Sequence, residues 1–174
     1  DNTKEIITDK NAGTGIVVGA TYIATGLIIA GALSGEGGDL ITGAVFWILG
    51  QAALVIAGLV YNFITPFNIH DEIEKDNVAV GVAFAGVIIA IGIIAGSGVS
   101  GDFISWQENL SFFGTEVLFG LIMLPIIRIV TDKLLLPGQK LTDELVNQEN
   151  PNVGAGAIEA FSYIAASMLI SWVI

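Results

Sequence analysis

Three charged side chains lie within long apolar runs of the chain and are the first candidates for chemistry: Glu116, Arg128 and Glu159. A charge removed from water is costly, so such a residue either has a partner of opposite charge or serves a function. Arg128 and Glu159 lie at similar depths in neighbouring runs, which favours a buried ion pair. The other interpretation makes them part of an ion path.

Glu116 is too far from Arg128 to be neutralised by it. Twelve residues separate the two, which is roughly 18 Å of helix. We expect a single carboxyl in such surroundings to be protonated, because desolvation disfavours its charged form. Gln51 has a corresponding depth in an earlier run, so we expect it to form with Glu116 either a hydrogen-bonded knot or part of a proton or cation path. Thr25 or Ser167 could complete this group.

The rest of the composition supplies little for catalysis. The chain has no Cys and a single His, His70, which excludes thiolate metal sites, cysteine nucleophiles and a two-His metal or haem site within one chain. The acidic connector 67–76 lacks the spacing and the glycine of a calcium loop. No phosphate-binding loop, Ser/His/Asp set or zinc-protease helix occurs. We therefore expect no enzyme activity, no cofactor and no metal site.

The apolar runs themselves predict an all-α integral membrane protein with five transmembrane helices. Of 174 residues, 53% are hydrophobic and 13% are charged, far from the average of soluble domains. Runs of about 20 apolar residues are long enough to span a bilayer, so membrane lipid is the first partner. A net charge of −11 would repel nucleic-acid phosphates, which excludes nucleic acid as a partner. The expected spans are 14–34, 40–65, 78–96, 109–130 and 152–174.

One motif occurs three times, each time at the start of an apolar run: Asn, any residue, Ala or Gly, any residue, Gly. Its first residues are Asn11, Asn77 and Asn152. Asn in this position caps a helix, because its side chain accepts a hydrogen bond from a backbone N–H of the first turn. Three helix starts that converge on a cytoplasmic anion are the alternative. An acidic–aliphatic pair precedes each copy: Glu5-Ile6, Glu72-Ile73 and Glu144-Leu145.

This recurrence predicts a single transmembrane domain, 1–174, built from a repeated two-helix unit. The units cover about 5–66 and 72–131, and a half unit, 144–174, follows. In a complete unit a helix running inward comes before the acidic pair, yet nothing precedes Glu5. We therefore expect native residues upstream of Asp1.

Lysine and arginine are confined to one side of a five-span arrangement. All six lie in the N-terminal segment, in the two long connectors or near the inner end of the fourth run, whereas the turns 35–39 and 97–108 contain none. Because cytoplasmic loops carry the excess of positive charge, this distribution predicts a cytoplasmic N-terminus and an outside C-terminus.

The middle copy of the motif resembles a family of small bacterial inner-membrane proteins known as domain of unknown function 350. The similarity covers nearly the whole chain, is closest at 69–96 and is looser at 141–160, where Pro151 intervenes. It implies tandem repeats of paired helices, joined by acidic connectors, in a multi-pass protein of the bacterial inner membrane. It implies no particular activity. The residues that carry the resemblance are Asp71, Glu72, Ile73, Asn77, Ala79, Gly81 and Gly86.

Two functions of different classes remain. Small residues at four-residue spacing, such as Gly15 with Gly19 and Gly92 with Gly96, let membrane helices approach closely. The first hypothesis is therefore a structural or assembly subunit, in a homo-oligomer or with other membrane subunits. The alternative is an ion channel or proton-coupled transporter that uses the intramembrane carboxylates. A transport pathway needs more polar lining than one or two carboxylates, which favours the first.

Overall fold

The structure, a computed structural model, describes residues 1–173 and contains only helices as regular elements in that range. Five helices are long and apolar enough to cross a membrane, as the apolar runs predict. These are α1 (Ala12–Ala32), α2 (Leu40–Ile64), α4 (Val78–Gly98), α5 (Trp106–Val130) and α7 (Val153–Val173). The short helices in the connectors are η1 (Lys4–Thr8), α3 (Ile69–Glu74), η2 (Thr131–Leu135) and α6 (Leu141–Val146).

The helices that follow the tight turns begin at side-chain caps. Asp39 accepts a hydrogen bond from the N–H of Thr42, and the Thr42 hydroxyl accepts one from the N–H of Asp39. This reciprocal pair satisfies two backbone donors at the start of α2. Ser105 accepts from the N–H of Glu108, so α5 starts at Trp106, three residues before the expected span.

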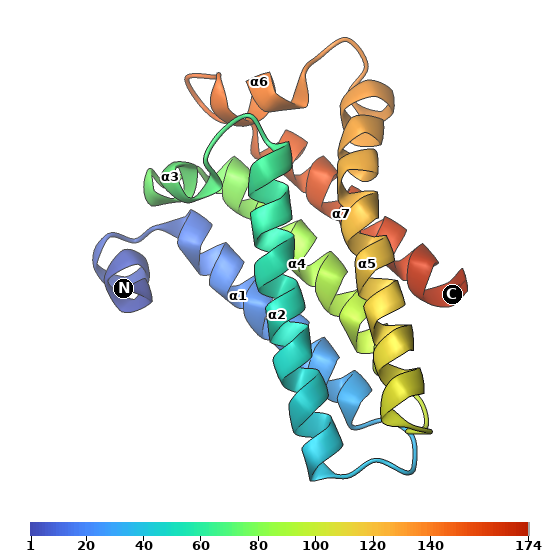
Figure 1. The fold of residues 1–174 in the computed structure, drawn as a ribbon. Helices are drawn as coiled ribbons and strands as arrows, with labels where there is room; N and C mark the ends of the chain where they lie inside the picture. The colour runs from blue at the N-terminus through green and yellow to red at the C-terminus, as the bar shows by residue number, and fades with distance from the viewer. Residues whose placement is uncertain (174) are drawn as a thin grey trace.

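The long helices form two layers (Figure 1). In the back layer α1, α4 and α7 lie side by side and run in the same direction, with α4 in contact with both neighbours. In the front layer α2 and α5 run the opposite way. Helix α2 contacts α1 and α4, and α5 contacts α4 and α7. Each front helix therefore covers one of the two grooves between the helices of the back layer.

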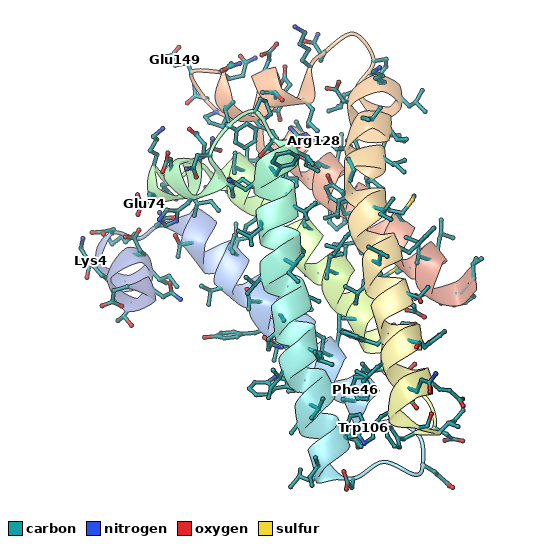
Figure 2. The ribbon with its side chains drawn as sticks, in the orientation of Figure 1. Lys4, Phe46, Glu74, Trp106, Arg128 and Glu149 are labelled. Atoms are coloured by element: carbon teal, nitrogen blue, oxygen red, sulfur yellow. The ribbon has the colours of Figure 1, made fainter. Side chains whose placement is uncertain are left out.

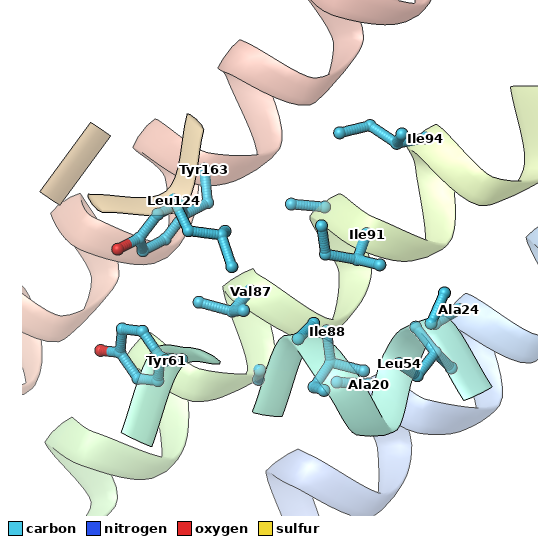
Figure 3. Close-up of a cluster of buried hydrophobic side chains, with 14 of the residues drawn as sticks. Ala20, Ala24, Leu54, Tyr61, Val87, Ile88, Ile91, Ile94, Leu124 and Tyr163 are labelled. Atoms are coloured by element: carbon cyan, nitrogen blue, oxygen red, sulfur yellow. The ribbon is translucent and has the colours of Figure 1, made fainter. Parts of the chain in front are cut away.

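Helix α4 forms the centre of the core. It carries no charged residue and is buried along most of its length, as expected of a helix enclosed by others. Figure 3 shows Val87, Ile88 and Ile91 of α4 among side chains from the surrounding helices, such as Ala24 of α1 and Leu124 of α5. The core of the bundle is thus aliphatic.

Glycine lets α4 approach its neighbours to backbone contact. A Cβ on Gly92 would lie 2.6 Å from the Cα of Ala24 on α1, and a Cβ on Gly86 would lie 2.5 Å from the Cβ of Ala160 on α7. Because both distances are well inside van der Waals contact, neither position admits a larger residue unless the helices move apart. Close approach of this kind is how membrane helices gain packing energy where lipid offers no hydrophobic drive.

The connectors lie at two opposite ends of the bundle (Figure 2). At one of them the N–H of Phe103 donates to the carbonyl of Glu36 at 2.8 Å. Beside this bond Trp106 stacks on Phe46, with ring centroids 6.1 Å apart, and fixes α5 against α2. We call this the turn end, formed by residues 33–39 and 99–105, and the other the connector end, formed by residues 1–11, 65–77 and 131–152.

Candidate functional site

Arg128 and Glu159 form an ion pair inside the bundle near the connector end. The guanidinium Nη1 donates to Oε1 of Glu159 and so joins α5 to α7. Glu159 is fully buried and Arg128 is 9% exposed. Nη2 of Arg128 donates to the hydroxyl of Thr142 at 3.3 Å, which ties the pair to α6. The contact is the buried ion pair of the first interpretation, and a role in an ion path stays a prediction.

Two buried tyrosines complete the surroundings of the pair. The Tyr163 hydroxyl donates to Oε1 of Glu159 at 3.4 Å. The Tyr61 hydroxyl accepts from Nη1 of Arg128 at 3.4 Å, and the guanidinium carbon is 5.7 Å from the centre of the Tyr61 ring. A connected network of this kind offsets part of the cost of taking both charges out of water.

The second oxygen of Glu159 is unused. Oε2 is buried and has no hydrogen-bond partner among residues 1–173. A pocket of about 430 Å³ reaches Arg128 and Thr142, and its lining includes Asp132 and Lys140 of the connector end. The ion pair therefore includes one carboxyl oxygen without a hydrogen-bond partner, and a pocket lined partly by charged residues reaches its arginine. Chemically, the guanidinium can stabilise Glu159 as a carboxylate, and Oε2 can still accept a hydrogen bond.

Glu116 lies apart from this network. It is 1% exposed, and its carboxyl lies against Gly98 of α4, where a Cβ would be 3.5 Å from Oε2. Oε2 is buried without a partner within the described chain. The salt bridges found between residues 1 and 173 do not include Glu116. The carboxyl is thus buried without a counter-charge among residues 1–173, and its protonation stays a prediction.

The expected group around Glu116 forms only in part. Oε1 of Gln51 accepts a hydrogen bond from the Thr25 hydroxyl at 3.2 Å, which joins α1 to α2. Thr25 is one of the two residues expected to complete the group. No hydrogen bond in the described chain joins Gln51 to Glu116, and the Ser167 hydroxyl donates to the carbonyl of Ile164 instead. The physical reason is the direction of the two side chains. Helices α2 and α5 contact each other at other levels, but Gln51 bonds to Thr25 of α1, whereas the Glu116 carboxyl lies against Gly98 of α4.

The three repeated Asn residues cap α1, α4 and α7. In each case Oδ1 accepts from a backbone N–H three residues on: Thr14 for Asn11 (2.8 Å), Val80 for Asn77 (3.1 Å) and Ala155 for Asn152 (3.1 Å). Each Nδ2 donates to the acidic residue of its own connector: Glu5 (3.4 Å), Glu72 (3.0 Å) and Glu144 (2.8 Å). The acidic residue of the motif thus accepts from the Asn that caps the following helix.

The same amide groups also join successive units. Nδ2 of Asn11 donates to the carbonyl of Ile73 at 2.7 Å, and Nδ2 of Asn77 donates to the carbonyl of Leu145 at 2.9 Å. We call these two bonds the inter-unit ladder. Sequence reasoning assigned the Asn residues a capping role, with a shared anion site as the alternative, and did not include a bond between units. The signal for the second role was the aliphatic residue beside each Glu, which supplies the accepting carbonyl to the preceding unit.

Glu72 is held in its ionised form by this arrangement. Partial burial raises its pKa, but the hydrogen bonds from Asn77 and Lys75 outweigh burial and hold the pKa below its ordinary value. The carboxylate is therefore fully ionised at neutral pH and acts only as an acceptor.

Because Asn77 both accepts and donates, we expect Asn77→Asp to be destabilising. Capping alone would make Asp an acceptable replacement. Here Asp cannot donate to the buried Leu145 carbonyl and adds a second carboxylate beside Glu72, so the free energy of unfolding should fall by about 1–3 kcal/mol. Denaturant unfolding in detergent measures it. Asn152→Asp, which loses only an exposed bond to Glu144, is the matched control and should cost less. If Asn77→Asp were as stable as the wild type, the hydrogen bond that Asn77 donates to Leu145 would not contribute to stability.

Sequence reasoning missed the polar groups around the ion pair, Tyr61, Thr142 and Tyr163. Tyrosines in apolar runs are usually interpreted as core or interface residues. One signal was available: Tyr163 follows Glu159 by four residues and so shares its helix face. No group of three or more His, Asp or Glu side chains between residues 1 and 173 is arranged to hold a metal ion.

Comparison with known proteins places this architecture in a family. A UPF0719 transmembrane protein of Aquifex aeolicus (strain VF5) is 24% identical over 171 residues, which are 95% of this chain and 62% of that protein. The chain therefore spans less than two thirds of the length of that relative. No solved structure matches the chain. The family model described as Domain of Unknown Function (DUF350) matches residues 35–174, from the turn before α2 to the last residue. Since this match covers four of the five spanning helices, the chain belongs to that family of membrane proteins.

Proposed function

We propose that this protein is a structural or assembly subunit of an oligomeric membrane complex, associated through helix faces made of small residues. The observation that carries the proposal is on α1. A Cβ placed on Gly15, Gly19 or Gly26 would have no neighbouring atom within 4 Å, whereas Gly86 and Gly92 of α4 contact the next helix directly. In a membrane, small residues stabilise association because they let a second backbone come close. An open face of this kind on α1 favours a partner helix.

The distribution of polar groups supports the same function. Glu116 lies near the turn end and Glu159 near the connector end, and the core between them is aliphatic. A continuous polar lining, which conduction of ions requires, is absent from the core of the described bundle. The Arg128–Glu159 network joins α5, α7, α6 and α2, which suits a structural role.

A specific observation favours an ion channel or proton-coupled transporter as the second candidate. Two buried carboxyl oxygens, Oε2 of Glu116 and Oε2 of Glu159, have no partner among the described residues. The pocket at the connector end reaches Arg128, the ion-pair partner of Glu159. Intramembrane carboxyls of this kind serve as proton relays in pumps and transporters.

We further infer that the protein lies in a bacterial inner membrane with its connector end in the cytoplasm. All six Lys and Arg residues belong to the connectors of that end or to the adjoining turn of α5, and the residues of the turn end carry none. Because the chain has no Cys, a single Cys introduced at Glu36 or at Glu74 can be labelled from outside intact cells. Labelling at position 36 and protection at position 74 are expected, and the reverse result rules out this orientation.

The proposed function is tested on the purified chain and its Glu116→Gln and Glu159→Gln variants. We expect particles of several copies by native mass measurement and no proton or cation flux into liposomes for any of the three proteins. Gln keeps the shape of Glu but cannot cycle a proton, so it separates packing from transport. Flux in the wild type that disappears in a Gln variant with unchanged particle mass would overturn the structural function in favour of transport.

A further inference from the structure

We propose that copies of this chain associate head to tail, with α7 of one copy against the open face of α1 in the next. The inference rests on the proposed function and names its partner as a second copy. The back layer already uses this interface twice, once between α1 and α4 and once between α4 and α7. Within residues 1–173, one half of the interface is left uncovered on each outer helix.

The capping Asn residues set the register in which the three helices are compared. From Asn11 to Asn77 the shift is 66 residues, and from Asn77 to Asn152 it is 75 residues. All three helices run in the same direction in one layer (Figure 1). A residue of α1 therefore corresponds to the residue 66 positions later in α4, and a residue of α4 to the residue 75 positions later in α7.

In this register the two internal interfaces are made by corresponding residues. Gly13 of α1 contacts Gly81 of α4, and the corresponding residues, Ala79 of α4 and Gly156 of α7, contact each other. A Cβ on Gly81 would lie 2.8 Å from the Cα of Gly13, so both pairs are in backbone contact. The same helix-to-helix interface is thus built twice within one chain.

The first half of a third interface is free on α1. Gly81, Ala85 and Gly92 are the α4 residues on the face toward α1, and Gly15, Gly19 and Gly26 correspond to them. On α4 these residues are buried, and on α7 their equivalents, Gly156, Ala160 and Ser167, are buried as well. On α1 the three glycines are not buried, and space for a Cβ is open at each. The pattern of small residues is kept on the one helix where no other helix of residues 1–173 covers it.

The second half is free on α7. The α1 face toward α4 includes Gly13, Ala20 and Ala24, and the corresponding α7 residues are exposed. Phe161 among them is 67% exposed. The exposed α7 residues that correspond to this face are Gly154, Phe161, Ala165 and Met168, with Trp172 at the end of the helix.

Side-chain sizes fit this third interface. Gly86 of α4 contacts Ala160 of α7, and the same step along the array brings Phe161 of one copy opposite Gly19 of the next. The equivalent of Gly19 is Ala85 on α4 and Ala160 on α7. Gly19, the smallest residue among these three equivalents, therefore faces Phe161, which is larger than its own equivalents Ala20 and Gly86. A small residue opposite a large one allows the two helices to pack closely.

The connector end supplies a second, independent match. Asn11 and Asn77 each donate to a carbonyl of the following unit, whereas the only acceptor for Nδ2 of Asn152 in the described chain is its own Glu144. Ile6 holds the place of Ile73 and Leu145 in the motif. A second copy that docks on α7 in the repeated register brings the carbonyl of Ile6 to the free N–H of Asn152 and extends the inter-unit ladder. Such a head-to-tail contact closes into a ring or continues as an open array.

Cysteine cross-linking in membranes tests this arrangement, because the chain has no Cys of its own. Gly26 corresponds to Gly92, and Ala165 corresponds, through Ala90, to Ala24. Because Ala24 of α1 contacts Gly92 of α4, Ala165 of one copy faces Gly26 of the next across the proposed contact. Chains with Gly26→Cys and chains with Ala165→Cys are coexpressed with different tags and oxidised. We expect a product of twice the 18.2 kDa chain mass that carries both tags, and none from either variant alone. Ile48→Cys with Leu118→Cys, exposed at 58% and 59% on the front layer, is the matched control and should not cross-link.

A second variant keeps the test independent of cross-linking chemistry. Gly19→Leu should not destabilise a single copy, because a Cβ at this position has no neighbouring atom within 4 Å, and should reduce the assembled fraction at least tenfold. Phe161→Ala in the same chain should restore assembly. A cross-link by Gly26→Cys alone, which indicates a symmetric α1–α1 contact, would overturn the proposal. Particles of several copies without the Gly26–Ala165 cross-link would overturn it too, yet leave the proposed function standing. Single copies that conduct ions would overturn both.

Discussion

Replacing Arg128 with Leu should lower the free energy of unfolding by about 3–5 kcal/mol, because it leaves the fully buried carboxylate of Glu159 without its counter-charge. It also removes the bonds that tie α5 to Thr142 and Tyr61. Unfolding in mixed micelles, followed by tryptophan fluorescence, measures the change. The loss should shrink at acidic pH, since a protonated Glu159 is neutral and tolerates the missing partner.

The double variant Arg128→Leu with Glu159→Leu is the control for this prediction. With both charges replaced by apolar side chains, no desolvated charge remains, and stability should return to within about 1–2 kcal/mol of the wild type. A double variant as unstable as Arg128→Leu alone would mean that the network, rather than the unpaired charge, carries the stability. A cost below about 1 kcal/mol for the single variant would mean that Glu159 has another partner.

The pairing of Arg128 with Glu159 could be predicted because depth along two consecutive spans fixes it. Helices joined by a connector are usually neighbours, and residues at similar distances from that connector meet if they face each other. Equal depth in the membrane was not sufficient to predict whether Gln51 and Glu116 contact each other. Their helices α2 and α5 are neighbours, yet Gln51 bonds to Thr25 of α1 and Glu116 lies against Gly98 of α4. Which face a nearly uniform apolar helix presents to which neighbour cannot be predicted from periodicity, since an all-apolar sequence has almost none.

The inter-unit ladder shows a different reason for a missed prediction. The capping role of Asn77 is local, because the Asn and its acceptor N–H lie three residues apart. Its donor role depends on Leu145, 68 residues further along the chain, which comes close only after α4 and α7 pack together. The five spans, the caps and the repeat follow from local sequence. The bonds between units follow from how close the glycines of the back layer allow the helices to come.

The second large effect is on the free energy of unfolding, and it should differ between Gly→Ala substitutions at two corresponding positions, Gly92 on α4 and Gly26 on α1. A Cβ on Gly92 would lie 2.6 Å from the Cα and the Cβ of Ala24, and because the Cα is backbone, the contact cannot be relieved by rotating a side chain. Gly92→Ala must therefore force α1 and α4 apart. We expect the free energy of unfolding to fall by about 1–3 kcal/mol, the usual cost of overpacking.

Gly26→Ala is the matched control, measured in detergent dilute enough to keep one chain per micelle. No neighbouring atom lies within 4 Å of its added methyl group. Ala is a better helix former than Gly, so this variant should gain up to about 0.5–1 kcal/mol. The two substitutions are chemically identical and correspond in register, so a difference in sign can arise only from what lies against each helix. If Gly92→Ala were as stable as Gly26→Ala, the backbone contact between α1 and α4 would be wrong. The repeated interface on which head-to-tail association depends would then be lost with it.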